Sequence, residues 1–234
     1  MISIINIVIL LFLLFGAVVG FKKGAITSLV NFIGTLGCIV LAFLLKNPLS
    51  VFMYTNLPFF NFGGVFEGIT VLNVIIYEAI AFFIVLSVLF TILKLLLRIS
   101  GIIETILNAT IILGIPSKIL GMIFGVIEAF LFCYIVLFIM NQIPNTKPLV
   151  EGSEVGKAIL EKTPCLSSMM NTITESIDEI YIIAKDGKIN EETNREAFEI
   201  LIKNEILTTE NARKLVESGK LEIDNADEII KKYE

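Results

Sequence analysis

The stretch Gly-Ala-Val-Val-Gly-Phe-Lys-Lys-Gly at residues 16–24 decides how this chain folds. Three glycines stand four residues apart in it, at Gly16, Gly20 and Gly24. The flanking residues 2–19 and 25–45 are almost continuously apolar. Because about 20 helical residues cross a hydrocarbon core of about 30 Å, each flank is long enough to span a bilayer. The stretch is therefore predicted to be a short turn between two membrane helices.

The composition also indicates a membrane protein. Of 234 residues, 56% are hydrophobic and 18% are charged, whereas soluble domains have about 45–50% and about 25%. The apolar excess lies before residue 145, and most of the charge follows it. We predict an all-α polytopic membrane protein, with a four-span transmembrane domain at residues 1–143 and a polar helical tail at residues 144–234.

The apolar runs predict four spans, at residues 2–20, 25–45, 71–97 and 118–140. Before the last span, residues 99–113 carry Ile and Leu at helical spacing with polar residues opposite. This pattern predicts an amphipathic helix in the membrane interface, which Pro116 is expected to end.

Residues 47–70 connect the second and third spans. They contain helix-breaking residues, beginning with Pro48, and six aromatic residues. Since aromatic side chains favour the membrane interface, we predict that this segment lies on the membrane surface. The alternative is a re-entrant loop, which would need protein cover for its backbone.

Basic residues predict the orientation. Five of them lie on one side of the predicted spans: Lys22, Lys23, Lys94, Arg98 and Lys118. The opposite side has Lys46 and Lys147. The larger set is expected in the cytoplasm, which places both termini outside it. The same five residues are expected to contact anionic lipid headgroups, and binding of an anionic solute is the other interpretation.

The tail is expected to be helical at residues 155–162 and 166–185, with a turn at Asp186-Gly187. Three shorter helices are predicted after it, each behind a candidate cap at Asn190, Thr209 or Asp224. Gly219 stands where a C-terminal cap belongs. We expect a small three-helix module with a slight core, which depends on a partner or the membrane surface for order.

Small residues form two stripes at a spacing of four. One is the glycine series at residues 16–24, and the other is Gly121, Gly125, Ala129 and Cys133 in the fourth predicted span. Such stripes let helices approach closely in lipid. One interpretation is packing within the chain, and the other is a surface for self-association or for a partner.

Glu128 lies about ten residues into the fourth span, near the predicted bilayer midplane. Because a charge there is costly, the carboxyl is expected to be protonated, paired or exposed to water. It is either a neutral group hydrogen-bonded to Asn31, Thr35 or a backbone carbonyl, or a proton or cation site. Glu78 is nearer the outer interface.

No catalytic or metal motif is found in the sequence. The chain has no His and only three cysteines, Cys38, Cys133 and Cys165, so imidazole-dependent chemistry and a disulfide framework are both excluded. We expect no enzyme activity, no cofactor and no metal. A net charge of −5 gives no reason to expect nucleic-acid binding.

The order of several motifs resembles the colicin V production protein family (CvpA). Gly-Phe-Lys-Lys-Gly at residues 20–24 is similar to the family's Gly-x-x-(Arg/Lys)-Gly turn, and the third span ends in basic residues as family members do. Residues 115–125 resemble the family's Leu-Asp-(Arg/Lys)-x-x-Gly-x-x-x-Gly. Residues 153–166 resemble the segment after its last helix. The resemblance covers about residues 1–170.

The resemblance implies an integral protein of the bacterial inner or plasma membrane, linked to peptide-toxin production or export. The chain departs from the family at Glu128, where a basic or small residue is more usual, and in the tail beyond Asp186. We hypothesise a non-enzymatic membrane component that acts through contacts with the lipid bilayer and with a second copy or an envelope or export protein. The alternative is a small oligomeric channel or transporter that uses Glu128 as a proton or cation site.

Overall fold

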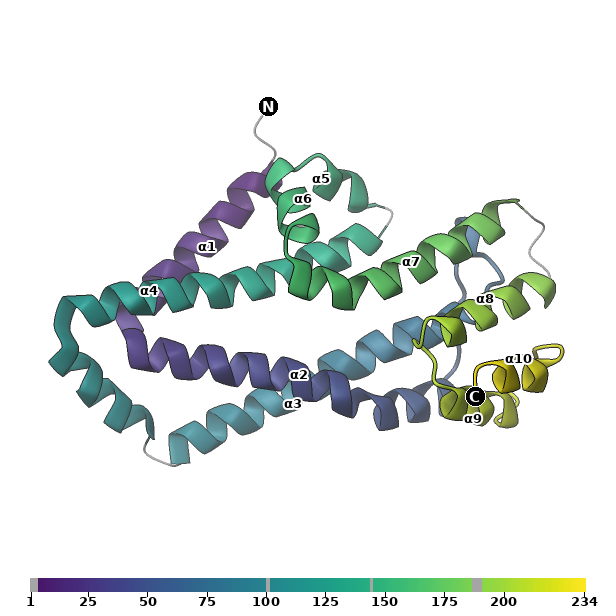
Figure 1. Cartoon of the computed structure of the whole chain (residues 1–234), viewed down its shortest axis with the longest axis horizontal. Coiled ribbons are helices and arrows are strands. Elements are labelled where there is room, and N and C mark those ends of the chain that lie inside the picture. Colours follow the sequence, from purple (N-terminus) through teal and green to yellow (C-terminus); the bar gives the residue numbers. More distant parts are fainter. Residues whose placement is uncertain (1–3, 100–101, 144, 187–190) are drawn as a thin grey trace. The chain divides into compact units, whose positions relative to one another are not determined.

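Apolar runs and, in the tail, amphipathic segments fold into helices in the part of the chain that the structure describes. The computed structural model describes residues 4–99, 102–143, 145–186 and 191–234. No strand occurs in these ranges (Figure 1). The elements are α1 (Ile4–Lys23), α2 (Ala25–Asn56), the short 3₁₀ helix η1 (Gly64–Phe66), α3 (Leu72–Ile99), α4 (Ile102–Gln142), α5 (Lys147–Glu151), α6 (Glu154–Glu161), α7 (Pro164–Asp186), α8 (Glu191–Lys203), α9 (Thr209–Glu217) and α10 (Ala226–Lys232).

Four of the described helices are long and apolar enough to cross a membrane. They are Ile4–Lys23, Ala25–Asn56, Leu72–Arg98 and Gly114–Gln142. This confirms the predicted all-α polytopic fold with four spanning helices.

The expected helix break at Pro48 is wrong. α2 continues through Pro48 and ends at Asn56. Proline removes one backbone hydrogen bond, but it does not end a helix whose residues on both sides are held by packing. Beyond Pro48, Met53 and Tyr54 are buried, and this burial holds the last turns of α2 in place.

Gly114, rather than Pro116, separates the predicted amphipathic helix from the fourth span. α4 is interrupted at Gly114, which has φ +61° and ψ −143°, a conformation that glycine tolerates best. Pro116 instead lies in the first turn after the break, where proline is accommodated because the first amide groups of a helix have no intrahelical partner. The location of residues 102–113 in the membrane interface remains a prediction.

The chain divides into two compact units. The first unit comprises Met1–Val40 and Val88–Ser167, and the second comprises Leu41–Ser87 and Ser168–Glu234. In the first unit, α1 packs along α4 and contacts α6. The hydroxyl of Ser153 donates a hydrogen bond to the side-chain oxygen of Asn6, so the start of α1 lies beside the residues that follow α4.

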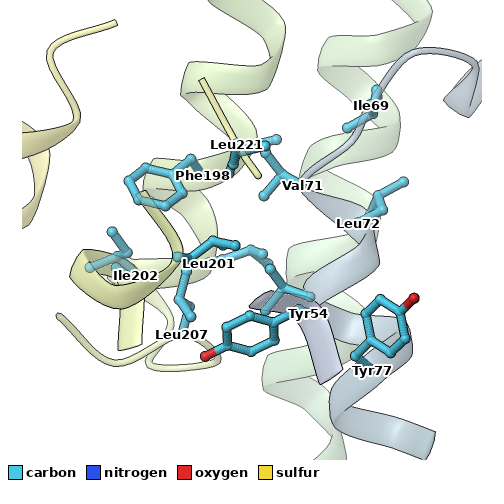
Figure 2. Packing of buried hydrophobic residues seen from close by; sticks show 14 of the residues in the cluster. Tyr54, Ile69, Val71, Leu72, Tyr77, Phe198, Leu201, Ile202, Leu207 and Leu221 are labelled. Carbon is cyan, nitrogen blue, oxygen red and sulfur yellow. The ribbon is translucent and has the colours of Figure 1, made fainter. Parts of the chain in front are cut away.

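In the second unit, the tail helices share one core with the ends of α2 and α3. Figure 2 shows Tyr54, Val71 and Leu72 packed with Phe198, Leu201 and Leu207. The tail helices therefore do not rely on a core of their own, because residues 53–81 supply much of the apolar surface against which α8, α9 and α10 pack. The hydroxyl of Tyr54 is buried in this core and has no hydrogen-bond partner.

A single side chain ties α8 to the connection between α2 and α3. The Asn194 side-chain oxygen accepts hydrogen bonds from the backbone N–H of Thr70 at 2.9 Å and from the Thr70 hydroxyl at 3.0 Å. Its amide nitrogen donates to the carbonyl of Gly68 at 3.0 Å. These bonds fix the connection against the tail.

Two of the predicted tail caps are displaced by one residue. The N-cap of α9 is Thr208 rather than Thr209, and its hydroxyl accepts from the backbone N–H of Asn211 at 3.3 Å. α10 follows Asn225 rather than Asp224, and Asn225 has φ +56°, which asparagine tolerates. Gly219 has φ +66° just after α9, as a C-terminal cap requires. Asn190 and Gly187 lie outside the described residues.

The contacts within each unit agree with four crossings. Four spans put the N-terminus, the α2–α3 connection and the tail on one side of a membrane. In the first unit Asn6 contacts Ser153, and in the second unit Thr70 contacts Asn194. The proposed boundary between membrane domain and tail at residue 143 remains a prediction.

Candidate functional site

The two stripes of small residues face each other where α1 crosses α4. A Cβ atom added to Gly20 would lie 2.1 Å from the carbonyl oxygen of Gly121, and one added to Gly125 would lie 2.3 Å from the carbonyl oxygen of Gly16. A Cβ atom on Gly16 would meet the Cβ of Ala129 at 2.5 Å. The two backbones are therefore in direct contact, and the stripes pack within one chain.

Gly24 and Ser117 build the turn between α1 and α2. Gly24 has φ +78°, which ends α1 and lets α2 begin at the next residue. The first amide of α2, at Ala25, donates to the Ser117 hydroxyl at 3.0 Å. Ser117 is buried in α4, so α4 caps the start of α2. This role of Ser117 was not predicted, although Ser117 directly precedes Lys118 at the entry to the fourth span.

The basic residues lie at helix ends, as the orientation argument requires. Lys22 and Lys23 are in the last turn of α1, and Arg98 is in the last turn of α3, where positive charge is favoured by the helix dipole. Lys94 lies one turn before Arg98. The ammonium of Lys118 lies 5.8 Å from the centroid of the Phe21 ring, so this lysine links the start of the fourth span to the end of α1.

Glu128 has a hydrogen-bond partner within the first unit. The Thr35 hydroxyl, which is buried in α2, donates to Oε1 of Glu128 at 2.9 Å. Thr35 is one of the three partners that the sequence suggested. Asn31, another of these, lies one turn earlier on α2. A half-buried carboxyl at membrane depth is thus tied to a neighbouring helix.

A hollow of about 200 Å³ lies beside the α1–α4 crossing. Gly16, Gly20 and Gly125 of the crossing form part of its wall. Its lining includes three polar side chains, Lys23, Ser28 and Glu128, among aromatic ones. Water or a small cation could occupy such a hollow next to the carboxyl group.

A buried ion pair joins α2 to α3 in the second unit. The Lys46 ammonium contacts the Glu78 carboxylate, and these side chains are only 13% and 9% exposed. The Ser50 hydroxyl donates to the other oxygen of Glu78 at 3.1 Å. Lys46 and Glu78 were not predicted to form a pair. Their opposite charges, each close to the same connection, were the signal for the pair.

The described residues show no candidate metal centre. In this part of the chain, no group of three or more Cys, Asp or Glu side chains is placed to hold a metal ion. Cys38 and Cys133 are buried free thiols. The side chain of Cys165 lies outside the described residues.

Substitution of Gly20 by alanine should destabilise the protein, because the new methyl group would overlap the Gly121 carbonyl. Overpacking of this kind costs about 1–3 kcal/mol or more. Gly37 provides the control, since a Cβ there meets nothing within 4 Å. Thermal unfolding in lipid nanodiscs should show a lower midpoint for Gly20→Ala and little change for Gly37→Ala. Equal midpoints for the two variants would contradict the crossing.

Removal of one charge from the Lys46–Glu78 pair should destabilise the second unit. Glu78→Gln leaves the Lys46 ammonium buried without a counter-charge, which costs about 3–5 kcal/mol. The double variant Lys46→Met with Glu78→Gln should be more stable than Glu78→Gln alone, because it removes the unpaired charge. The same unfolding assay compares them. The single variant Lys46→Met is measured as well. If the double variant lost at least as much unfolding free energy as the two single variants together, Lys46 and Glu78 would not stabilise each other.

Comparisons with known proteins agree with this arrangement. The family model described as colicin V production protein matches residues 5–164, which include α1 to α6. An uncharacterized transmembrane protein, YshB of Bacillus subtilis (strain 168), is 29% identical over 176 residues, which cover 72% of this chain and 96% of that protein. No solved structure matches the chain. Since the matched segment is more than half of the chain, this membrane protein belongs to the colicin V production protein family.

Proposed function

We propose that this chain is a non-enzymatic protein of the bacterial cell membrane that supports peptide-toxin production or export, or envelope homeostasis. The protein acts through its contacts. Its own helices pack together, and the assembled helices bind a second copy of the chain or an envelope or export protein. The description of its family supports the biological role.

The packing at the α1–α4 crossing is the main support for a function that depends on contacts between helices. Its small residues are used for packing within the chain, which leaves the other surface of α1 covered with large apolar side chains. The exposed ones include Ile7, Val8, Leu11, Phe15 and Val18. Such a surface is suited to lipid or to another helix. Glu128 already has Thr35 as a partner, which is what a structural carboxyl group needs in a membrane.

The hollow beside Glu128 favours a second candidate function. A small oligomeric channel or transporter needs an ionisable group with access to solvent. Glu128 lines the hollow, and so does Lys23 at the end of α1. Proton or cation movement through this hollow would depend on the Glu128 carboxyl group.

Complementation of a deletion strain separates the two candidate functions. We expect Glu128→Gln to retain activity, because its side chain can still accept the Thr35 hydrogen bond. Gly125→Leu should abolish activity, because a side chain there overlaps the Gly16 carbonyl, whereas Gly37→Leu should be active. Membrane levels of each variant are measured in parallel. Proton-dependent flux in proteoliposomes that disappears with Glu128→Gln would instead support the transporter.

We further propose that both termini lie outside the cytoplasm, as the basic residues at the opposite helix ends indicate. Cys165 follows the last predicted span, and the other two cysteines are buried. A membrane-impermeant maleimide should therefore label intact cells, and Cys165→Ser should remove the labelling. Labelling only after permeabilisation would reverse the orientation.

A further inference from the structure

α2 and α3 are longer than a bilayer requires. At 1.5 Å per residue, their 32 and 28 residues measure about 48 Å and about 42 Å. A hydrocarbon core is about 30 Å thick. The distance along α2 from Ala25 to Lys46 is about 32 Å, and the distance along α3 from Glu78 to Arg98 is about 30 Å. In both helices the excess length therefore lies on the same side of the Lys46–Glu78 pair.

Most of the apolar core of the second unit lies beyond the same pair. On the side toward the middle of the spans, large apolar residues are exposed, including Leu41, Leu44, Leu45, Phe83 and Ile84. On the other side a set of apolar residues is buried in the core shared with the tail, including Met53, Tyr54, Val71, Val74 and Tyr77, while Phe52 and Ile76 remain exposed. Exposed apolar side chains in a continuous band suit acyl chains. Residues buried in a core of their own do not need lipid.

The helices that cover this core suit water. α8, α9 and α10 have buried apolar residues on one side and charged residues on the other, among them Glu191, Glu192, Lys214 and Lys231. Their exposed ion pairs, such as Lys214 with Glu210 and Lys232 with Glu199, are typical of a solvated surface.

The ion pair itself suits a boundary. Lys46 and Glu78 neutralise each other, and Ser50 satisfies the second carboxylate oxygen. A paired and hydrogen-bonded charge is tolerated at the edge of the hydrocarbon, where a single charge would be costly.

We propose that the Lys46–Glu78 pair marks the boundary of the hydrocarbon core, and that everything beyond it in the second unit forms a water-exposed head. The head consists of the projecting ends of α2 and α3, their connection, the part of α7 that packs in the same core and the tail helices α8 to α10. The lipid bilayer contacts the exposed apolar side chains on the other side of the pair, toward the middle of the spans. This arrangement replaces the expectation that residues 47–70 lie flat on the membrane surface.

Matched cysteine pairs test this boundary. Leu45 and Phe52 are one heptad apart on the same side of α2, and they are 52% and 58% exposed. Ile76 and Phe83 are the equivalent pair on α3, at 37% and 39%. Each is changed singly to cysteine in the full chain with its three native cysteines replaced by alanine. Unsealed membranes are then treated with a membrane-impermeant maleimide, so that the orientation does not affect the result.

Phe52→Cys and Ile76→Cys should react about as strongly as Lys231→Cys, a control on the exposed surface of α10. Leu45→Cys and Phe83→Cys should react several-fold less, and should reach full labelling only after detergent solubilisation, because thiolate chemistry needs water. Equal labelling within each pair would overturn the boundary. Protection of Phe52→Cys and Ile76→Cys while Lys231→Cys reacts would place the boundary farther out. Protection of Lys231→Cys would exclude a water-exposed head.

Discussion

The backbone contact between Gly20 and Gly121 is the constraint on which the first unit depends. Because no side chain separates α1 from α4, the entry to the fourth span lies beside the α1–α2 turn, and Ser117 can reach the first amide of α2. The hollow that Glu128 lines borders the same crossing. Apolar association contributes little between helices in lipid, so close backbone packing is what holds such a crossing together.

The second unit adds a structure that the matched family segment does not contain. That segment ends at residue 164, whereas α8, α9 and α10 begin at Glu191. These helices share a core with the ends of α2 and α3, which belong to the matched segment. The chain therefore carries its own cover for this apolar surface. Since YshB aligns over 72% of this chain and nearly all of its own length, a relative can be complete with a shorter chain.

Local patterns were sufficient to predict some features of the protein and insufficient for others. Apolar runs predicted the four spanning helices, and the glycine series predicted the turn at Gly24, because both depend on residues close in sequence. The passage of α2 through Pro48, the Lys46–Glu78 pair and the shared core of the tail were not predicted. Each depends on contacts between distant segments: Glu78 is 32 residues from Lys46, and Phe198 packs with residues near Tyr54. Thr35 was predicted as one of three alternatives, and only the packing of α2 selects it.

Disulfide trapping tests the central claim, that the two stripes of small residues pack within one chain. Gly16 and Ala129 face each other across the crossing, so the variant Gly16→Cys with Ala129→Cys places two thiols in contact after a small separation of the helices. With the native cysteines replaced, mild oxidation should consume both thiols while the protein remains a monomer on a non-reducing gel. A covalent dimer would contradict the account, because the stripes would then join two chains.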